Sequence, residues 1–352
     1  MKICFTLSSL SAGGAERVAT SLANSFAKEG HSVTLILVSI DHNNTFYELN
    51  NSIDVVPLIK SKKDKKFYRR VKILRNKIAE KKPDIVISFL PHICIYTYFA
   101  LKNTSIPYIC SERNDPNQYN LLNKILLKKS FNRADGCVFQ TSSARDYYRC
   151  VKNERAAIIC NPVNLHLSGA AVRNEQKNKV FISVGRLVPQ KNFQVLISSF
   201  SKFNKIRPNY KLVIYGEGPL RNDLENQIQR MGIQNLVSLP GNNQYWHDEA
   251  INATAFISTS NFEGMPNCLE EALSLGCPSI ATNCPVGGSK DLISILGHGT
   301  LIDMNNEQQL ISKMIDIADG KYKFNGVDYS VLELKNISSQ WLSFIDKILK
   351  QK

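Results

Sequence analysis

The sequence predicts an α/β protein of two domains, each built on a parallel sheet that helices cover on both faces. The chain has 352 residues, which is about twice the length of a typical domain. Short apolar strand candidates alternate with helical patterns along the whole chain, as is typical of parallel sheets. The strand candidates also fall into two series separated by a polar stretch, and this separation predicts the two domains.

Each series supplies the strands of one domain. The seven candidates of the first series are Lys2–Leu7, Ser32–Ser39, Asp54–Leu58, Asp84–Phe89, Tyr108–Cys110, Gly136–Gln140 and Ala157–Cys160. The six candidates of the second series are Val180–Val184, Tyr210–Tyr215, Val237–Leu239, Ala255–Ser258, Ser279–Thr282 and Gly299–Leu301. Since helical patterns lie between the strands, we expect strand–helix–strand units in both domains.

The polar stretch Asn164–Lys179 has few large apolar residues and is the best linker candidate. We therefore expect an N-terminal domain at residues 1–165 and a C-terminal domain at residues 176–335. Residues 336–352 complete the chain as a helix. Apolar side chains recur at helical spacing over Leu332–Lys350, at Leu334, Ile337, Trp341, Phe344, Ile345 and Ile348. We expect this amphipathic helix to pack back on the N-terminal domain.

The composition excludes several classes of protein. Hydrophobic residues make up 43% and charged residues 21% of the chain, so wholesale disorder is excluded. The uncharged, apolar stretch Ile85–Leu101 has 17 residues and contains a proline, whereas a membrane-spanning helix needs about 20 apolar residues. The first residues lack the pattern of a signal peptide. The nine cysteines are scattered without a C-x-x-C pair, which argues against a disulfide framework or a zinc site and indicates a reduced, cytosolic protein.

Positive charge is concentrated in the first half of the chain. The formal net charge is +14, and residues 1–165 carry 25 basic and 13 acidic side chains. Lys60–Lys82 alone carries 12 basic and 2 acidic residues. Its apolar residues, like those of a second basic segment at Leu121–Arg133, recur at helical spacing. Such segments indicate an anionic partner, either a membrane surface or a nucleic acid, or else they are solvated surface helices.

Candidate functional residues lie in the loops that follow strands, because ligands of open parallel sheets bind beyond the carboxyl ends of the strands. If the two domains face each other, the site lies in the cleft between them. The first such loop contains Gly13 and Gly14 and opens a helix. Backbone amides can approach a ligand closely there, and a helix N-terminus favours negative charge. The loop is neither a G-x-G-x-x-G nor a Walker sequence, which argues against a dehydrogenase or a nucleotide hydrolase.

Two loops of the second series also carry candidate residues. The strand Val180–Val184 leads into a short loop with Arg186 and Lys191, which together could clamp a diphosphate. The next strand ends in a glycine turn that contains Gly216. This turn is weak evidence by itself, because Gly and Pro often mark a plain turn.

The most informative stretch is Asn261–Ala272, which contains two separated carboxylates. Pro266 suits the start of a helix that would run to about Leu275. Glu263 then precedes the helix, and Glu271 lies two turns along it. Two carboxylates at different depths suit hydrogen bonds from sugar hydroxyls. An acid near a helix start can simply offset the helix dipole, which explains Glu270 well but not Glu263.

Taken together, these motifs resemble the retaining glycosyltransferases of the GT-B fold, family four. The resemblance rests on motifs in the family's order from residue 13 to about residue 272: Gly13-Gly14-Ala15-Glu16-Arg17, Asn161-Pro162-Val163-Asn164, Gly185-Arg186-Leu187 with Lys191, Gly216-Glu217-Gly218-Pro219-Leu220-Arg221, and Glu263 with Glu271. The chain is most similar to the bacterial enzymes that extend lipid-linked oligosaccharides for surface polysaccharide or protein glycosylation. The resemblance implies two Rossmann-like domains that face each other across a cleft.

The resemblance also implies roles for these residues. Arg186 and Lys191 would hold the donor diphosphate and stabilise the leaving group, and Glu263 would bind the transferred sugar. These three are the expected catalytic residues, and Glu271 would bind the ribose. The full expected donor site is Gly13, Gly14, Arg186, Lys191, Gly216, Glu263, Gly264, Met265, Pro266, Asn267 and Glu271. No metal or other cofactor is expected, because the Arg/Lys pair stabilises the leaving phosphate.

The sequence departs from the family at one position. Many relatives have a His just after the fifth strand of the first domain, and Arg113 stands at that point in Ser111-Glu112-Arg113-Asn114-Asp115-Pro116. His92 is a second candidate for this contact, although a His beside a proline in an apolar run is more often a packed turn residue. The expected contacts to the acceptor or sugar are Arg113, His92, Glu16 and Arg17.

We therefore expect a retaining glycosyltransferase that moves a sugar from a nucleotide donor, with UDP favoured, to a polyprenyl-diphosphate-linked saccharide. It would be a peripheral protein on the cytoplasmic face of the plasma membrane. The expected membrane patch is Lys62, Lys63, Lys65, Lys66, Arg69 and Arg70. Two alternatives stay open: a related enzyme on soluble substrates, such as a nucleotide-sugar epimerase or a soluble-glycoside synthase, and a nucleic-acid-binding protein. The latter lacks a recognisable reading module and gives Glu263 and Glu271 no task.

Overall fold

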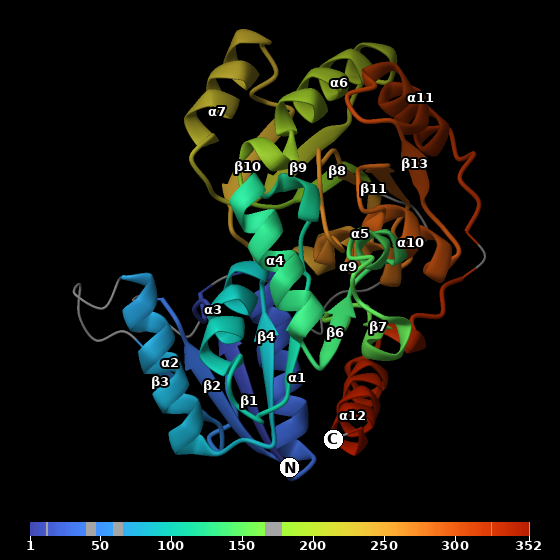
Figure 1. The fold of residues 1–352 in the computed structure, drawn as a ribbon. Helices are drawn as coiled ribbons and strands as arrows, with labels where there is room; N and C mark the ends of the chain where they lie inside the picture. The colour runs from blue at the N-terminus through green and yellow to red at the C-terminus, as the bar shows by residue number, and fades with distance from the viewer. Residues whose placement is uncertain (12, 40–46, 59–65, 166–177, 325, 352) are drawn as a thin grey trace. The chain divides into compact units, whose positions relative to one another are not determined.

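The computed structural model describes residues 1–11, 13–39, 47–58, 66–165, 178–324 and 326–351. The chain divides into two compact units (Figure 1). The first unit combines Met1–Pro162 with Val331–Lys352, and the second unit is Val163–Ser330. Each unit has its own sheet and its own apolar core, as the α/β interpretation of the sequence requires.

The first unit is built on a seven-stranded sheet in the order β3-β2-β1-β4-β5-β6-β7, in which every neighbouring pair is parallel. Its strands are β1 (Lys2–Leu7), β2 (Ser32–Leu37), β3 (Asp54–Pro57), β4 (Ile85–Phe89), β5 (Tyr108–Ser111), β6 (Gly136–Phe139) and β7 (Ala156–Ile158). The strand order reverses between β1 and β4, which is where open parallel sheets bind ligands.

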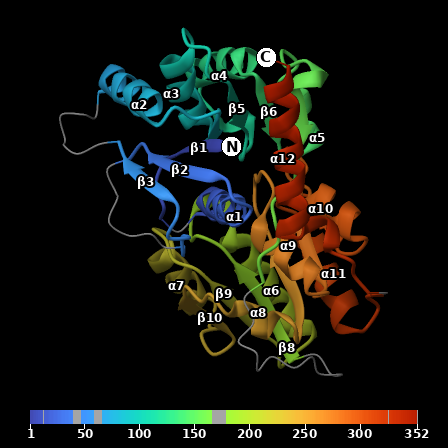
Figure 2. The ribbon, with the colours of Figure 1, turned by 90° about the horizontal axis from the view of Figure 1, so that it is seen from below.

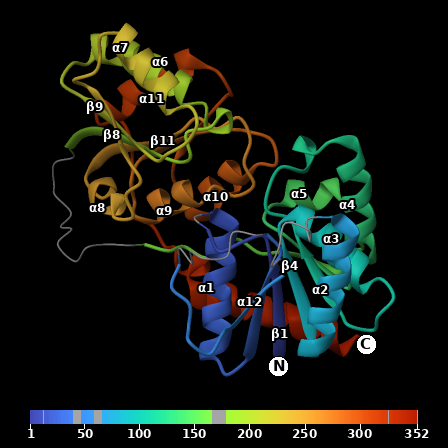
Figure 3. The ribbon, with the colours of Figure 1, turned by 90° about the vertical axis from the view of Figure 1, so that its left-hand side faces the viewer.

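Helices cover both faces of this sheet (Figures 2 and 3). The helices are α1 (Gly14–Lys28), α2 (Phe67–Lys81), α3 (Pro91–Leu101), α4 (Leu121–Arg133), α5 (Ser142–Tyr147) and α12 (Leu334–Lys350). Single turns lie at η2 (Pro116–Gln118) and η3 (Asn153–Arg155). In both views α1 and α12 lie side by side on one face, whereas α2, α3 and α4 form a row on the other.

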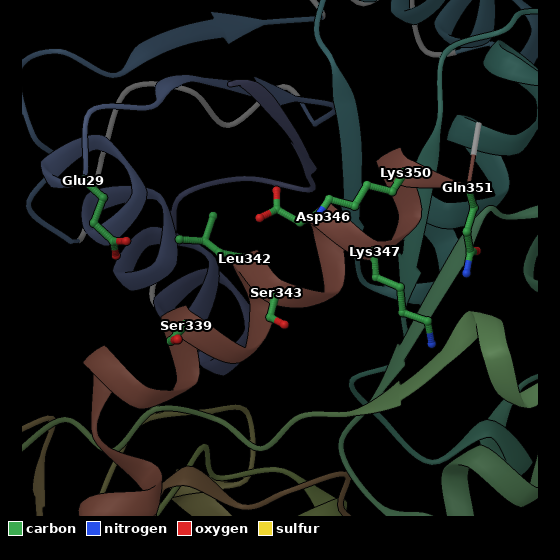
Figure 4. A pocket seen from close by; sticks show the side chains of 8 residues that line it. All are labelled: Glu29, Ser339, Leu342, Ser343, Asp346, Lys347, Lys350 and Gln351. Carbon is green, nitrogen blue, oxygen red and sulfur yellow. The ribbon is translucent and has the colours of Figure 1, made fainter.

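The C-terminal helix α12 is part of the core of the first unit, which confirms the prediction that it packs back there. Trp341 is fully buried, and its ring stacks on Phe89 of β4 with centroids 5.6 Å apart. Phe344, Ile345 and Ile348 join the same apolar cluster. The exposed side of α12 and Glu29 line a groove of about 720 Å³ (Figure 4). Because Glu29 follows the end of α1, this groove lies away from the carboxyl ends of the strands.

The second unit is built on a six-stranded parallel sheet in the order β10-β9-β8-β11-β12-β13. Its strands are β8 (Asn178–Val184), β9 (Lys211–Tyr215), β10 (Val237–Gly241), β11 (Ala253–Ser258), β12 (Ser279–Thr282) and β13 (Thr300–Ile302). Here the order reverses between β8 and β11.

The helices of the second unit also lie in two layers. Contacts join α6 (Phe193–Ile206), α7 (Arg221–Arg230) and α11 (Glu307–Ala318) on one face, and α8 (Trp246–Ala250), α9 (Asn267–Ser274) and α10 (Gly288–Leu296) on the other (Figure 3). Single turns lie at η4 (Pro189–Lys191) and η5 (Ser330–Leu332). The core of this unit is rich in Phe, with Phe181, Phe200 and Phe203 in mutual contact.

All thirteen predicted strands are present, and their ends differ from the predictions by a few residues. The proposed linker falls mostly on residues 166–177, which lie outside the described part of the chain. All nine cysteines are described and none forms a disulfide, as expected. Among the described helices, none is long and apolar enough to cross a membrane.

Candidate active site

The candidate residues of the second unit gather where its strand order reverses. Arg186 and Lys191 lie in the loop after β8, and Glu263 lies in the loop after β11. Since β8 and β11 are neighbours and parallel, their carboxyl ends meet at the same edge of the sheet. Glu271 lies on α9, which follows the second of these loops. The structure therefore brings Arg186, Lys191 and Glu263 to one edge of the sheet from two distant segments, and Glu271 follows on the next helix.

Lys191 and Glu263 form an ion pair at this edge. The distance from Lys191 Nζ to Glu263 Oε1 is 2.5 Å, and the two side chains are 18% and 11% exposed. Ser260 Oγ donates a second hydrogen bond to Oε1 at 2.8 Å, and Gln190 Nε2 lies 3.4 Å from Oε2. The Glu263 carboxylate is thus held from two directions, and the Lys191 ammonium points at it.

The charge of Lys191 depends on this carboxylate. Burial is the largest single influence and lowers the pKa of the Lys191 ammonium, but the charge of Glu263, its hydrogen bond and the nearby Cys268 together outweigh burial, so the pKa lies above the ordinary value. The positive charge of Arg186 acts on the same group in the opposite sense. Arg186 itself is exposed. The site therefore offers one partly buried, paired cation and one exposed cation from the same loop.

Further hydrogen bonds fix the two loops to each other. Thr259 Oγ1 donates to the carbonyl oxygen of Lys191 at 3.0 Å, and the backbone N–H of Asn261 donates to the carbonyl of Gln190 at 2.8 Å. The backbone that carries Lys191 is therefore bonded to the loop that carries Glu263. Such support holds catalytic groups in place before a ligand arrives.

Two glycines allow neighbouring loops to approach closely. Gly216 has a φ of +141°, and a Cβ at this position would lie 1.9 Å from the carbonyl oxygen of Gly185. A Cβ on Gly288 would lie 1.7 Å from the carbonyl oxygen of Gly264. The loops after β8, β9, β11 and β12 are therefore packed backbone against backbone at the carboxyl edge, and larger residues cannot replace these glycines without displacing a loop.

Glu271 has a partner that the sequence did not reveal. His247 on α8 places Nε2 at 3.1 Å from Glu271 Oε2, and both side chains are almost fully buried. Since a carboxylate is an acceptor, the imidazole N–H is the donor. His247 precedes Glu271 by 24 residues and sits in no recognisable motif, so no local signal pointed to it.

The remaining predicted donor residues surround α9. Pro266 is the N-cap of α9, as its predicted place at the helix start implies, and Met265 is buried just before it. Asn267 opens the helix and is half-buried. Their predicted contacts with a donor stay predictions.

In the first unit, the loop after β1 leads into α1 as predicted. Gly13 is the N-cap of α1 and Gly14 is its first residue, and Gly14 is exposed. Tyr47 Oη donates a hydrogen bond to the carbonyl oxygen of Gly13 at 3.2 Å. Glu16 and Arg17 lie in the first turn of the helix and are half-buried. Their roles in binding stay predictions.

Arg113 is buried in a polar and aromatic cage. Its Nε donates to Ser111 Oγ and its Nη1 to Asn161 Oδ1, each at 2.8 Å, and the guanidinium lies 4.6 Å from the centre of the Phe89 ring. These contacts join β5 to the Asn161 motif and to the core near α12. A structural task for Arg113 is therefore evident, and its predicted contact with substrate stays a prediction.

His92 does not have the packed position that its proline neighbour suggested. It is exposed in the first turn of α3, after Leu90, whose φ of +77° is strained for a non-glycine residue. Partial loss of water around the ring, the larger cause, and the positive charge of Arg70 lower the pKa of His92. His92 follows β4 and so lies beside the strand-order reversal of the first sheet.

Glu112, beside Arg113, is the centre of a second network that the sequence did not predict. Its buried carboxylate accepts hydrogen bonds from Tyr148 Oη at 2.6 Å and from Tyr119 Oη at 3.0 Å, and from the backbone N–H groups of Arg113 and Asn114. Burial raises the pKa of Glu112 to about 7, although these four donors act in the opposite direction.

Part of the predicted membrane patch lies outside the described residues, namely Lys62, Lys63 and Lys65. Lys66 is the N-cap of α2, Arg69 is exposed and Arg70 is half-buried. Exposed apolar side chains lie in the same turn, with Phe67 44% and Tyr68 62% exposed. Within the described ranges, no cluster of three or more His, Cys, Asp or Glu side chains is arranged to hold a metal ion.

Two family models match the chain, one for each half. The model described as Glycosyltransferase Family 4 matches residues 12–167, and the model described as Glycosyl transferases group 1 matches residues 170–325. Together they cover every strand except β1 and include all the candidate site residues discussed above. The chain belongs to this glycosyltransferase family. The protein is therefore an enzyme, as the motifs predicted. This finding favours the glycosyltransferase interpretation of the sequence over the nucleic-acid-binding alternative.

Named relatives and solved structures agree with this assignment. The glycosyltransferase is 29% identical to GalNAc-alpha-(1->4)-GalNAc-alpha-(1->3)-diNAcBac-PP-undecaprenol alpha-1,4-N-acetyl-D-galactosaminyltransferase of Campylobacter jejuni, over 99% of each chain. It is 28% identical to N-acetylgalactosamine-N,N'-diacetylbacillosaminyl-diphospho-undecaprenol 4-alpha-N-acetylgalactosaminyltransferase of the same organism, over 61% of this chain and 58% of that one. The crystal structure of HepE of Anabaena in complex with UDP has a TM-score of 0.74 and 17% identity, and covers 100% of this chain and 98% of that one. The GT-B fold expected from the motifs is confirmed.

Proposed function

We propose that the enzyme is a retaining glycosyltransferase that moves a sugar from a UDP-linked donor to a polyprenyl-diphosphate-linked saccharide, without a metal ion. The observation that carries this proposal is the Lys191–Glu263 pair beside Glu271, at the strand-order reversal of the second sheet. The donor would bind there, as ligands of such sheets do. The full-length relative, whose name specifies an undecaprenol-diphosphate acceptor, supports the acceptor class.

Each residue has a distinct proposed task. Lys191 and Arg186 bind the diphosphate and stabilise the negative charge that develops on it as the bond to the sugar breaks. Glu263 accepts hydrogen bonds from hydroxyls of the sugar, and Glu271 accepts them from the ribose. The acceptor hydroxyl forms the new bond to the anomeric carbon, and its proton passes to the leaving phosphate oxygen.

Transfer assays with purified enzyme test this proposal. A panel of nucleotide sugars is incubated with a polyprenyl-diphosphate-linked saccharide, and both the lengthened acceptor and the released nucleotide are measured. K191A and E271A should each lower the transfer rate at least about a hundredfold, because each removes a charge-assisted contact to the donor. The matched controls K205A and E225A change exposed residues of the second unit and should leave the rate unchanged.

Four outcomes would contradict the proposal. Full activity in both K191A and E271A would show that the site is elsewhere. Conversion of the nucleotide sugar to an epimer without any acceptor would instead indicate an epimerase. Transfer to soluble acceptors, with none to the lipid-linked saccharide, would indicate an enzyme of soluble glycosides. Full activity in a chelator would agree with metal independence, and loss that only a divalent cation restores would contradict it.

We also propose that the first unit binds the anionic cytoplasmic face of the plasma membrane through the start of α2. The exposed Phe67 and Tyr68 stand beside Lys66 and Arg69, so this turn offers apolar contact and positive charge together. Helix α4 offers a similar combination, since Leu121 is 75% and Leu122 66% exposed and the helix contains no acidic residue. Each basic residue near an anionic leaflet contributes about 1 kcal/mol.

Flotation with liposomes tests the membrane proposal separately from the chemistry. The vesicles contain about 30% anionic lipid, to resemble a PS-rich membrane. Binding to them should fall when salt is added, and it should be weaker for K66E/R69E than for the wild type. The matched control K205E/K211E reverses two exposed lysines of the second unit and should float like the wild type. Equal flotation of all three proteins would contradict the membrane proposal. The proposed chemistry would still be tested independently, by measuring sugar transfer to a short-chain acceptor in solution.

A further inference from the structure

We propose that His247 is a positioning residue for donor binding, which acts by holding the Glu271 carboxylate in the orientation that the ribose needs. The inference rests on the proposed ribose-binding role of Glu271. It concerns a residue in a different helix, outside every motif that identified the family, and it follows from the geometry around α8.

The contact between the two side chains is buried and well defined. His247 Nε2 lies 3.1 Å from Glu271 Oε2, and the two side chains are 2% and 1% exposed. A hydrogen bond to an ionised acceptor is stronger when water is excluded. The terminal torsion of a Glu side chain is broad, so a fixed donor on one oxygen sets the plane of the whole carboxylate. That plane decides whether the carboxylate can accept hydrogen bonds from both ribose hydroxyls.

The imidazole is itself held in place. Its ring stacks on Trp246, with centroids 4.2 Å apart and 30° between the ring planes. Trp246 is buried and packs against Phe256 of β11 at 5.7 Å. The core of the second unit therefore fixes the orientation of His247. A chain of contacts runs from β11 through Trp246 and His247 to Glu271.

Helix α8 is also anchored at a second point. Glu249 Oε1 accepts a hydrogen bond from Tyr215 Oη at 2.5 Å, and Tyr215 is the last residue of β9. A five-residue helix has little stability of its own, so its position depends on such contacts. Because α8 is fixed to β9, to β11 and to α9, it connects the Glu271 carboxylate to the sheet.

Two substitutions separate the hydrogen bond from the stacking. H247F keeps an aromatic ring on Trp246 but removes the N–H donor. H247Q removes the ring but supplies an amide N–H at a position similar to that of Nε2. Isothermal titration with UDP and with 2′,3′-dideoxy-UDP then reports the ribose contact directly, because the second nucleotide lacks both hydroxyls.

We expect H247F to raise the Kd for UDP on the order of tenfold, as the loss of one charge-assisted hydrogen bond predicts, and to leave the Kd for dideoxy-UDP within about twofold. H247Q should restore most of the affinity for UDP. In transfer assays, H247F should raise the donor KM more than it lowers kcat. A residue that only stabilises the fold would instead raise both Kd values equally and lower the melting temperature.

The outcomes distinguish this inference from the proposed function. If H247F binds UDP and dideoxy-UDP more weakly by the same factor, or binds UDP as tightly as the wild type, the proposed role of His247 is wrong. If E271Q keeps the full preference for UDP over dideoxy-UDP, the ribose assignment of Glu271 itself is wrong. If H247F does not fold, H247N answers the question, because its amide is too short to reach Glu271 and should show the same selective loss of UDP binding.

Discussion

Lys191 and Glu263 form an ion pair in the candidate active site, with Lys191 Nζ 2.5 Å from Glu263 Oε1. The two residues have different proposed ligands, a phosphate for the lysine and sugar hydroxyls for the glutamate. In the ligand-free enzyme, however, each is the other's partner. Burial of either charge alone would be costly, so each group stabilises the other at this position.

The first prediction concerns the pH dependence of this pair. Burial lowers and Glu263 raises the pKa of Lys191, with a net rise, so removing the carboxylate should lower that pKa. In E263Q the lysine would lose its proton at a lower pH, and the alkaline limb of kcat/KM should move toward neutral pH. The measurement is kcat/KM for the donor, from about pH 7 up to about pH 10.5. The upper limit is close to the ordinary pKa of a lysine.

The control for this experiment is E225Q, which neutralises an exposed acid of α7. It should keep the wild-type pH profile, with its alkaline limb unmoved. An E263Q enzyme with lower activity at every pH, but with an unshifted alkaline limb, would show that Glu263 does not control the charge of Lys191.

The second prediction concerns the close approach of two loops. G216A would place a Cβ 1.9 Å from the carbonyl oxygen of Gly185, so the loop that carries Arg186 and Lys191 must move. We expect a loss of at least about 2 kcal/mol of unfolding free energy, and weaker UDP binding, because overpacking costs 1–3 kcal/mol and the φ of +141° adds strain.

A matched control for G216A is G232A. Gly232 also has a positive φ, of +67°, but a Cβ there has no described atom within 4 Å. The G232A variant should lose about 1 kcal/mol of unfolding free energy through backbone strain, and it should bind UDP like the wild type. Chemical denaturation and UDP titration of both variants are the measurements. Equal effects of the two substitutions would mean that the contact between the loops does not matter.

The sequence predicted the parts of this site that lie in loops directly after strands. Arg186, Lys191 and Glu263 could be found because each follows a recognisable apolar strand and because the parallel pattern places such loops at one edge. The contacts of His247 and Glu112 could not be found in this way. His247 lies on a short helix with no periodic signal, and Glu112 meets Tyr119 and Tyr148 only when β5, η2 and α5 have folded together. Residues that contact a buried carboxylate from distant parts of the chain have no regular spacing by which the sequence would reveal them.

The third prediction concerns the C-terminal helix. Trp341 is fully buried against Phe89, and it also lies beside the Arg113 guanidinium, at 5.5 Å from the ring. W341A should lower the unfolding free energy by about 3–5 kcal/mol, as for other large-to-small changes in a core. S343A changes an exposed residue of the same helix and should have almost no effect. Denaturant titration checks both, and a W341A loss below about 1 kcal/mol would mean that α12 contributes little to the first unit.

The last prediction concerns Glu112 and the pH dependence of stability. Burial raises its pKa in the folded protein from an ordinary value of 4.5 to about 7, so between these pH values the folded state binds a proton that the unfolded state has lost. The contribution of Glu112 to stability therefore falls as pH rises from about 4.5 to about 7, and it is constant above that. The pKa difference corresponds to up to about 3 kcal/mol.

Other groups titrate in the same range, so the measurement must isolate Glu112. The difference in unfolding free energy between wild type and E112Q does this, because Gln cannot titrate and resembles the protonated acid in shape. This difference should grow in favour of the wild type as the pH falls from about 7.5 to 5, the range over which the buried carboxylate takes up its proton. The exposed variant E154Q should show a difference that hardly changes with pH. A flat difference for E112Q would mean that Glu112 has the same charge in the folded and unfolded states over this range, and that its four hydrogen-bond donors at least offset the cost of burial.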